Sequence, residues 1–165
     1  MNTKKNLIIF FLFFFILINS YTFLQGTPAS KGTIITVDND GDGDYTTITE
    51  AVLHAGPGDT IEVYSGTYNE RLINITSEDL TLQGIAHELG NGTDTGRPFI
   101  DGGGLFWIIS VMAPNVTITR FRMENQGETA TILINIEKSA LGCTISENAL
   151  IATLESFASD IKVDA

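Results

Sequence analysis

The sequence predicts an all-β fold, a right-handed parallel β-helix in which short strands stack in coils beneath one capping α-helix. Three observations predict it. A single short helix with capping signals is followed at once by a strand, β-rich runs of three to six residues recur with turn residues between them, and three of these runs share an apolar-Thr-apolar core. If each coil takes about 20 residues or more, the chain holds about five coils.

The chain begins with the pattern of a secretory signal peptide. Lys4 and Lys5 precede an unbroken apolar run, Leu7–Ile18, and a charged start followed by an apolar core of this length is typical of a secretory leader. A membrane-spanning helix needs about 20 apolar residues. We therefore expect a signal peptide over residues 1–29, with an uncleaved N-terminal anchor as the alternative. The β-helix domain is expected over residues 33–165, and the protein is expected to be secreted, periplasmic or on the cell surface.

The net charge and the cysteine content limit which partners and which cross-links the domain can have. Removing the expected leader leaves 136 of 165 residues, enough for one domain, and takes away two lysines but no acidic residue, so the net charge goes from −11 to −13. This charge argues against nucleic acid and anionic lipid surfaces as partners, because both would repel the domain. Membrane contact is then expected only through an uncleaved N-terminal segment. Cys143 is the single cysteine, so no internal disulfide forms, and its apolar context indicates an inert core residue.

An acidic segment follows the first expected strand, residues 33–37. Asp38, Asp40 and Asp42 match alternate ligand positions of a calcium-binding loop. The twelfth position of that motif should supply a bidentate Glu, but this chain has Thr49 there. The segment is therefore expected to be either a solvated turn or a weak calcium site made by Asp38, Asp40 and Asp42, and no other cofactor is expected.

The capping helix can be predicted residue by residue. Thr47 as N-cap and Glu50 three residues later form a capping box. Gly56 suits the left-handed position after the last turn, and Pro57 cannot continue the helix. An apolar stripe at helical spacing comprises Ile48, Ala51, Val52 and Ala55. So short a helix is unstable alone and must pack on something, for which the end of a β stack is suitable.

Short β-rich runs make up the rest of the domain. They are Ile61–Tyr64, Leu80–Leu82, Pro98–Ile100, Trp107–Val111, Val116–Ile118, Thr131–Ile134 and Cys143–Ile145. The three runs with the shared core start 36 and 27 residues apart, a spacing expected of stacked repeats. Alternation places Thr81, Thr117 and Thr144 on the outer face. Asn125 and Asn148 follow their strands and are expected in left-handed corners. A β-sandwich is the structural alternative.

These motifs resemble a known fold family. The opening of the domain resembles that of pectin-lyase-like right-handed β-helix proteins, through Gly43–Val52, Pro57–Val63 and Gly66–Glu70. Later segments resemble the repeats of NosD-type and archaeal surface β-helix domains, namely Ile100–Gly104, Asn115–Ile118 and Cys143–Asn148. The resemblance covers about residues 33 to 150 and supports the fold more than any activity. The opening also resembles the start of pectinesterases.

The resemblance to pectinesterases implies residues that this chain does not have. The family pattern has a Gln-Asp-Thr segment whose Asp is the general acid, then a second Asp as nucleophile, and an Arg. At the matching place this chain reads Asn148–Leu154, which contains no carboxylate. Chemistry on a sugar ester or glycoside needs paired carboxylates. We therefore expect no catalytic residues, with a fragment of a pectinesterase- or lyase-type enzyme lacking them as the alternative. Two carboxylates close together on one exposed face would favour an enzyme.

The resemblance to NosD-type proteins implies copper delivery as a further alternative. His54 and His87 are the only histidines, and neither falls in a cluster with metal-ligand spacing. Met112 and Met123 are interpreted as core residues. The sequence therefore gives copper little support.

The expected function follows from architecture and export. A flat, Thr-rich face of parallel strands could lie along a polysaccharide, so we expect an exported, non-catalytic β-helix domain that binds carbohydrate or acts as a structural module of the cell surface. Phe106 and Trp107 could stack on sugars, but their apolar context favours burial. Residues 155–165 show no polar capping repeat, so we expect either further coils or a partner that covers this end.

Overall fold

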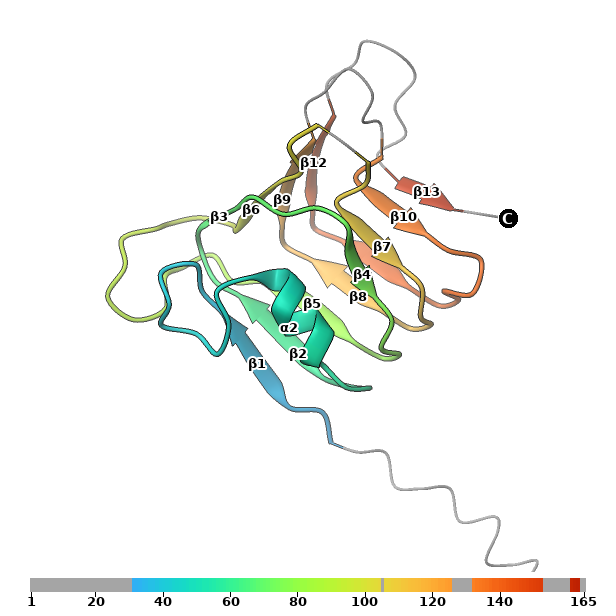
Figure 1. Ribbon diagram of the computed structural model, residues 1–165, viewed down its shortest axis with the longest axis horizontal. Coiled ribbons are helices and arrows are strands. Elements are labelled where there is room, and N and C mark those ends of the chain that lie inside the picture. The colour runs from blue at the N-terminus through green and yellow to red at the C-terminus, as the bar shows by residue number, and fades with distance from the viewer. Residues whose placement is uncertain (1–30, 105, 126–131, 153–160, 164–165) are drawn as a thin grey trace, which may run out of the picture. The chain divides into compact units, whose positions relative to one another are not determined.

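The computed structural model describes residues 31–104, 106–125, 132–152 and 161–163, which form a right-handed parallel β-helix (Figure 1). Every pairing between its strands is parallel, so the sandwich alternative is wrong for the described residues. Sheet A contains, in spatial order, β1 (Ile34–Val37), β2 (Thr60–Val63), β5 (Thr81–Gly84), β8 (Thr117–Thr119) and β11 (Thr144–Ser146). Its five strands agree with the expected number of coils.

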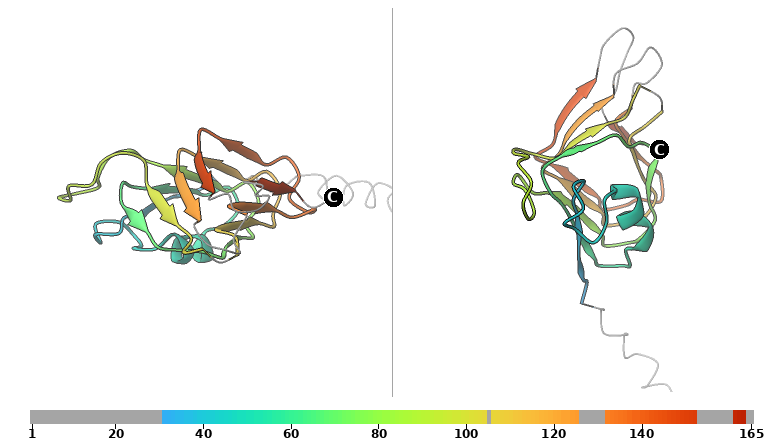
Figure 2. Two further views of the ribbon diagram at one scale, coloured as in Figure 1. Left: turned by 90° about the horizontal axis from the view of Figure 1, so that it is seen from above. Right: turned by 60° about the vertical axis from the view of Figure 1, so that its left-hand side comes forward.

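Two further sheets complete each coil. Sheet B contains β3 (Thr67–Tyr68), β6 (Phe99–Asp101), β9 (Arg122–Asn125) and β12 (Ala149–Ala152). Sheet C contains β4 (Ile73–Ile75), β7 (Ile109–Val111), β10 (Ile134–Ile136) and β13 (Ile161–Val163). The chain passes through sheets A, B and C in turn and then returns to sheet A one strand further along. Figure 2 shows the same stacking of strands from two other directions.

The core consists of columns of apolar side chains, because residues of the same type pair in register from coil to coil. In sheet A the inward column is Ile35, Ile61, Leu82, Ile118 and Ile145. In sheet C an inward column is Ile73, Ile109 and Ile134, all fully buried. Alternate residues of a strand point to opposite faces, so the intervening threonines of sheet A face outward, as predicted.

Helix α2 (Ile48–His54) packs against β1, β2 and β4 and covers the start of the stack. Its apolar stripe is buried as expected. Thr47 is the N-cap, and its hydroxyl accepts a hydrogen bond from the Glu50 N–H at 3.2 Å. The Glu50 carboxylate, however, lies near the Thr47 hydroxyl rather than on its backbone N–H, so only one side of the predicted capping box forms.

The other donors of the first helical turn bind a carboxylate from a later coil. Glu70, between β3 and β4, accepts hydrogen bonds from the backbone N–H groups of Ile48 and Thr49, both at 2.8 Å. It also accepts one from the Thr49 hydroxyl at 2.6 Å. A negative charge at a helix N-terminus is favourable, because the first N–H groups have no partner inside the helix. Glu70 therefore joins the cap to the coil beneath it.

The end of the helix differs from the prediction. Ala55 is the C-cap in an extended conformation, and the left-handed glycine is Gly58, with φ of 81°, rather than Gly56. Gly56 instead donates its N–H to a carboxylate oxygen of Asp59 at 2.7 Å. The other oxygen of Asp59 accepts the backbone N–H and the hydroxyl of Thr33. The short connection is thus closed by a side chain, which removes the need for a left-handed residue at Gly56.

The structure at the corners of the coils differs from the prediction for the two asparagines. Asn125 and Asn148 are not left-handed; their side-chain amides bridge backbone groups, Asn125 from Gly104 to Phe106 and Asn148 from Phe121 to Ile118. Before the strands of sheet A the left-handed residues lie two positions ahead of the strand; they are Gly58, Asp79, Asn115 and Gly142. Before sheet B, Arg120 and Glu147 are left-handed, each two positions ahead of its strand. Asx side chains and glycine tolerate this conformation.

Several strands were missed by the sequence patterns. Strands β3, β4, β9, β12 and β13 belong to none of the expected runs. In β9 only Met123 and Asn125 point inward, while Arg122 and Glu124 point outward, so the segment has little apolar character. Most of the expected strands also start one to three residues early, whereas Ile61–Tyr64 starts one residue late. Leu80, Pro98 and Val116, directly before β5, β6 and β8, are buried at the corners.

No helix among the described residues is long and apolar enough to cross a membrane. The expected leader, residues 1–29, lies outside the described residues, as do most of residues 155–165.

The contact between Glu70 and the cap predicts a stability effect. Replacing Glu70 with Ala should lower the free energy of unfolding by about 2 kcal/mol, because two helix N–H groups lose a charged acceptor. Urea unfolding followed by circular dichroism measures this change. Glu78→Gln is the control, since that exposed carboxylate makes no side-chain hydrogen bond within the described residues, and its effect should stay within about 0.5 kcal/mol. Equal losses for both variants would contradict the role of Glu70.

Asp59 predicts a dependence of stability on acid. The Thr33 N–H lowers the pKa of Asp59, desolvation opposes this, and the Gly56 N–H and the Thr33 hydroxyl lower it further. A carboxyl with a depressed folded-state pKa stabilises the fold at pH values above the unfolded pKa of about 3.9. That contribution disappears as the pH falls through the lower folded value. Asp59→Asn should therefore be less stable than wild type at neutral pH, and the difference should shrink towards pH 2, as measured by urea midpoints against pH. A constant difference would contradict this.

Candidate functional site

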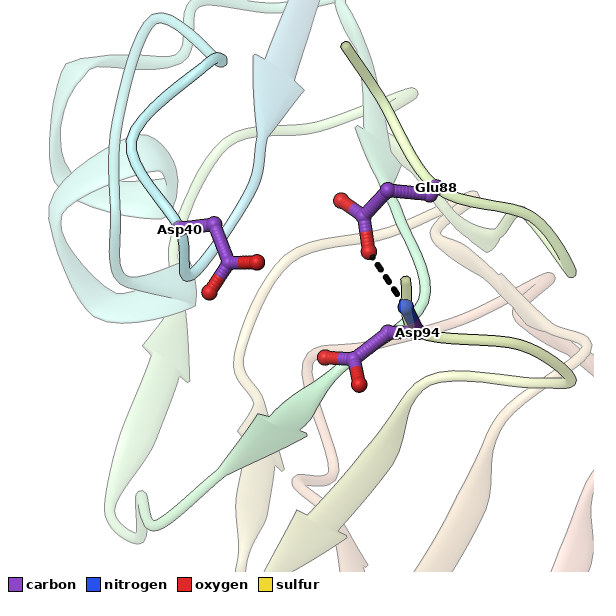
Figure 3. Close-up of side chains that lie close together, drawn as sticks. All are labelled: Asp40, Glu88 and Asp94. Carbon is purple, nitrogen blue, oxygen red and sulfur yellow. Dashed lines mark hydrogen bonds between the residues drawn. The ribbon is translucent and has the colours of Figure 1, made fainter. Parts of the chain in front are cut away.

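The three aspartates predicted to bind calcium do not lie in one cluster of their own. Asp40 lies with Glu88 and Asp94, whose carboxylate oxygens all come within 4.8 Å of one another (Figure 3). Asp38 is fully buried beside Glu88. Asp42 points elsewhere, and its carboxylate accepts the Asn91 N–H at 3.1 Å. Asp40, Glu88 and Asp94 thus form one group, and Asp38 adjoins it through Glu88. We define these four residues as the acidic cluster.

The acidic cluster forms where two loops meet. The loop after β1 carries Asp38 and Asp40, and the loop between β5 and β6 carries Glu88 and Asp94; the two lie side by side in Figure 1. An antiparallel bridge between His87 and Thr95 brings Glu88 and Asp94 together. Sequence reasoning missed Glu88 and Asp94, because nothing in the local pattern links residues almost 50 positions apart.

The charges of the cluster act on each other. Desolvation raises the pKa of Glu88, and the adjacent Asp38 carboxyl raises it further through a hydrogen bond and through repulsion. Burial also raises the pKa of the Tyr68 phenol, and the negative charges of Asp38, Glu88 and Glu70 act in the same direction. The ion pairs between described residues are Arg120–Glu147 and Arg122–Glu124, and neither involves the cluster.

The outer face of sheet A has a different chemistry. A threonine column, defined as Thr60, Thr81, Thr117 and Thr144, runs across four neighbouring strands in register. Neighbouring strands are about 4.8 Å apart, so the column presents hydroxyls at a regular spacing. Among the hydrogen bonds between described residues, none involves these four hydroxyls. Each can therefore donate and accept a hydrogen bond to a ligand.

The adjacent column of the same face is polar and bonded to itself. Its residues, in register, are Thr36, Glu62, Gln83, Thr119 and Ser146. The Gln83 amide donates to Glu62 at 3.0 Å, and the Ser146 hydroxyl donates to the Thr119 hydroxyl at 3.3 Å. These bonds order the edge beside the threonine column.

A shallow cleft of about 410 Å³ opens at the corner between sheets A and B. It is lined by Gly84, Ile85, Ala86, His87, Arg97, Arg120 and Glu147. Glu147 holds both arginines: its carbonyl accepts from Arg97, and its carboxylate pairs with Arg120 at 3.2 Å. Both side chains of that ion pair are more than half exposed, so the pair is weak and can exchange for another anion.

Sheet B provides the carboxylate pair that the sequence did not predict. Asp101 on β6 and Glu124 on β9 pair in register and point to the same outer face. Arg122 on the same face binds Glu124 at 3.0 Å, and its guanidinium lies over the Phe99 ring, 4.4 Å from the ring centre. The neighbouring strand β12, which matches the expected catalytic segment, has no carboxylate between Ala149 and Ala152.

The remaining candidate residues lie apart. His54 stacks on Tyr45, and His87 contacts the edge of Tyr64, so each histidine has its own aromatic partner. Phe106 is 60% exposed, which corrects the expectation that it is buried, and its ring meets Trp107 edge-on. Its backbone is left-handed, with φ of 60°, at the corner between sheets B and C.

Comparison with solved structures agrees with the fold. The chain is similar to a mutant of pectin methylesterase in complex with a hexasaccharide, with a TM-score of 0.57 and 17% sequence identity over 78% of this chain and 48% of that one. It is also similar to pectin methylesterase in complex with another hexasaccharide, with a TM-score of 0.59 and 17% identity over 78% of this chain and 45% of the other. The chain thus spans less than half the length of these structures. No protein-family model and no curated protein matches the sequence.

Proposed function

We propose that this protein is an exported, non-catalytic β-helix domain that binds polysaccharide along the outer face of sheet A. The observation that carries the proposal is the threonine column, with four in-register hydroxyls that have no partner within the described residues. A sugar chain presents hydroxyls at repeating intervals. A column of donors and acceptors at repeating intervals therefore matches it over several residues.

The fold and the leader support this function indirectly. Both similar structures are pectin methylesterases in complex with hexasaccharides, so folds of this kind do accommodate sugar chains. Fold similarity alone does not carry a function from one protein to another. The apolar leader over residues 1–29 supports export, which would bring the domain to extracellular or envelope glycans.

The cleft beside sheet A extends the proposed surface. Arg97 and Arg120 present guanidinium groups next to the polar column, where a carboxylate of a uronic acid could replace the weak contacts to Glu147. The net charge of the whole chain is −11, which repels acidic polymers at long range. Salt should therefore reduce this long-range repulsion and leave binding of a neutral polysaccharide unchanged.

The test is binding to a panel of neutral and uronic-acid polysaccharides, measured by affinity electrophoresis and calorimetry. The double variant Thr81→Val/Thr117→Val keeps the shape of the side chains but removes two hydroxyls, and should weaken binding roughly tenfold or more. Thr67→Val, on the outer face of sheet B, is the matched control and should bind like wild type. Retention on none of the polysaccharides, or equal loss in both variants, would overturn the proposal.

A second candidate function is hydrolysis at sheet B, favoured by one observation. Asp101 and Glu124 lie in register on strands about 4.8 Å apart, with Arg122 beside them. Two carboxylates at such a separation are close enough for one to act as acid and the other as nucleophile on a sugar substrate. Arg122 holds Glu124 in place, at 3.0 Å, which suits the nucleophile.

An activity assay separates the two functions. The binding proposal expects no release of methanol or reducing ends from esterified and de-esterified pectin above the blank. If wild type shows turnover and Asp101→Asn reduces it by about a hundredfold or more, catalysis at sheet B is the correct function. If turnover is equal in both, the activity belongs to a contaminant, and the binding proposal stands.

A further inference from the structure

We propose that the acidic cluster is a calcium site, with ligands from Asp38, Asp40, Glu88 and Asp94, that fastens the loop after β1 to the loop between β5 and β6. This inference is independent of sugar binding, because the cluster lies on the loops and the threonine column lies on the sheet.

The spacing of the oxygens suits calcium. Calcium binds carboxylate oxygens at about 2.3–2.6 Å, so two ligands on opposite sides of the ion are about 4.6–5.2 Å apart. One oxygen from each of Asp40, Glu88 and Asp94 lies within 4.8 Å of the other two, which fits one ion between them. Magnesium requires about 2.0–2.1 Å and octahedral geometry, so its opposite ligands must be no more than about 4.2 Å apart.

A buried, unpartnered oxygen points independently to a cation. Asp38 is fully buried, and one of its carboxylate oxygens accepts no hydrogen bond from an N–H or hydroxyl group of the described residues. The other oxygen accepts the Asp42 N–H at 3.1 Å. Burying a carboxylate without a partner is costly. The Asp38 carboxyl lies beside that of Glu88, so a divalent ion bound at Glu88 would compensate the buried charge.

The surroundings hold the acids together without neutralising them. The backbone N–H groups of Leu89 and Asp94 bind the two oxygens of Glu88 at 3.1 and 3.0 Å. A side chain at Gly92 would collide with the Glu88 carboxylate, and one at Gly90 would collide with Asp42 on the facing loop. The two glycines therefore allow the loops to approach closely. His87, the basic residue next to Glu88, contacts Tyr64 instead.

The inferred ligand set revises the motif read from the sequence. Asp42 is replaced by Glu88 and Asp94, because its carboxylate already binds the Asn91 N–H and so aligns the two loops. Thr49, at the position where a helix-loop-helix calcium site has its bidentate Glu, donates its hydroxyl to Glu70. The site is thus assembled from two distant loops rather than from one continuous motif.

The experiment titrates Ca²⁺ and Mg²⁺ separately into EDTA-treated, dialysed protein, with calorimetry and thermal unfolding as readouts. We expect a Ca²⁺ dissociation constant on the order of 10⁻⁴ M, a raised Tm, and Mg²⁺ binding weaker by roughly tenfold or more. Glu88→Gln and Asp94→Asn should each weaken Ca²⁺ binding by about tenfold or more while the protein stays folded, since both residues lie on a surface loop. Asp38→Asn tests whether the buried carboxylate contributes to the Ca²⁺ affinity, which should then fall as well.

The matched control is Glu78→Gln, which removes one exposed carboxylate away from the cluster. It should bind Ca²⁺ like wild type. Three results would overturn the site: no Ca²⁺-dependent heat or Tm shift up to about 10 mM, well above the weakest extracellular sites; equal weakening by Glu78→Gln, which would indicate general screening of an acidic protein; or a Tm that rises equally with both ions. If Asp38→Asn unfolds, the Glu88 and Asp94 variants still decide.

Discussion

The structure depends on one constraint: each coil must turn at the same point, so that every strand lies in register on the one before. Four left-handed residues meet it, Gly58, Asp79, Asn115 and Gly142, each two positions before a strand of sheet A. Backbone hydrogen bonds link successive corners, from the Gly58 N–H to the Glu78 carbonyl, from Asp79 to Pro114 and from Asn115 to Leu141. Asn115 also donates to the Asp79 side chain at 3.0 Å. With the corners aligned, equivalent residues of successive strands are in register, which produces the inner columns of isoleucine and the outer column of threonine.

Aligned corners also determine where extra residues go. The step from Thr60 to Thr81 in sheet A takes 21 residues, and the next step, to Thr117, takes 36. The strands cannot absorb the difference without losing register, so the additional length is placed mainly between β5 and β6. That loop reaches back to the loop after β1, which is why residues that follow the first and third strands of sheet A contribute to one acidic cluster. The loop that varies in length from coil to coil is therefore where a binding site can form without disturbing the strand register.

The sequence predicted what depends on neighbours in the chain and failed where distant coils decide. The helix stripe, the Thr47 cap and the outward threonines follow from local spacing and were confirmed. The role of Glu70 at the helix start could not be predicted, because it depends on a contact across 22 residues. Asn125 and Asn148 have the composition of left-handed corners, but their amides bind backbone groups of other coils instead. Asp101 and Glu124 are unremarkable in sequence and become a pair only through strand register. The sequence at β12 could show only that this strand has no carboxylate; it could not show the carboxylate pair on the neighbouring strands.

The absence of a disulfide gives the loops a particular need for another cross-link. The chain has one cysteine, so no covalent bond can restrain its long excursions. A cross-link that closes a loop of tens of residues stabilises a fold mainly by restricting the unfolded chain, by about 2–4 kcal/mol for a disulfide. An ion held by Asp40 and Glu88 would close a loop of similar size, since these residues are 48 positions apart. It would also relieve the repulsion that Asp38 and Glu88 otherwise impose on the folded state. Acidic composition and loop geometry thus both favour the proposed calcium site. Without a cation the clustered carboxylates repel one another, whereas with a bound cation the same carboxylates would hold the two loops together.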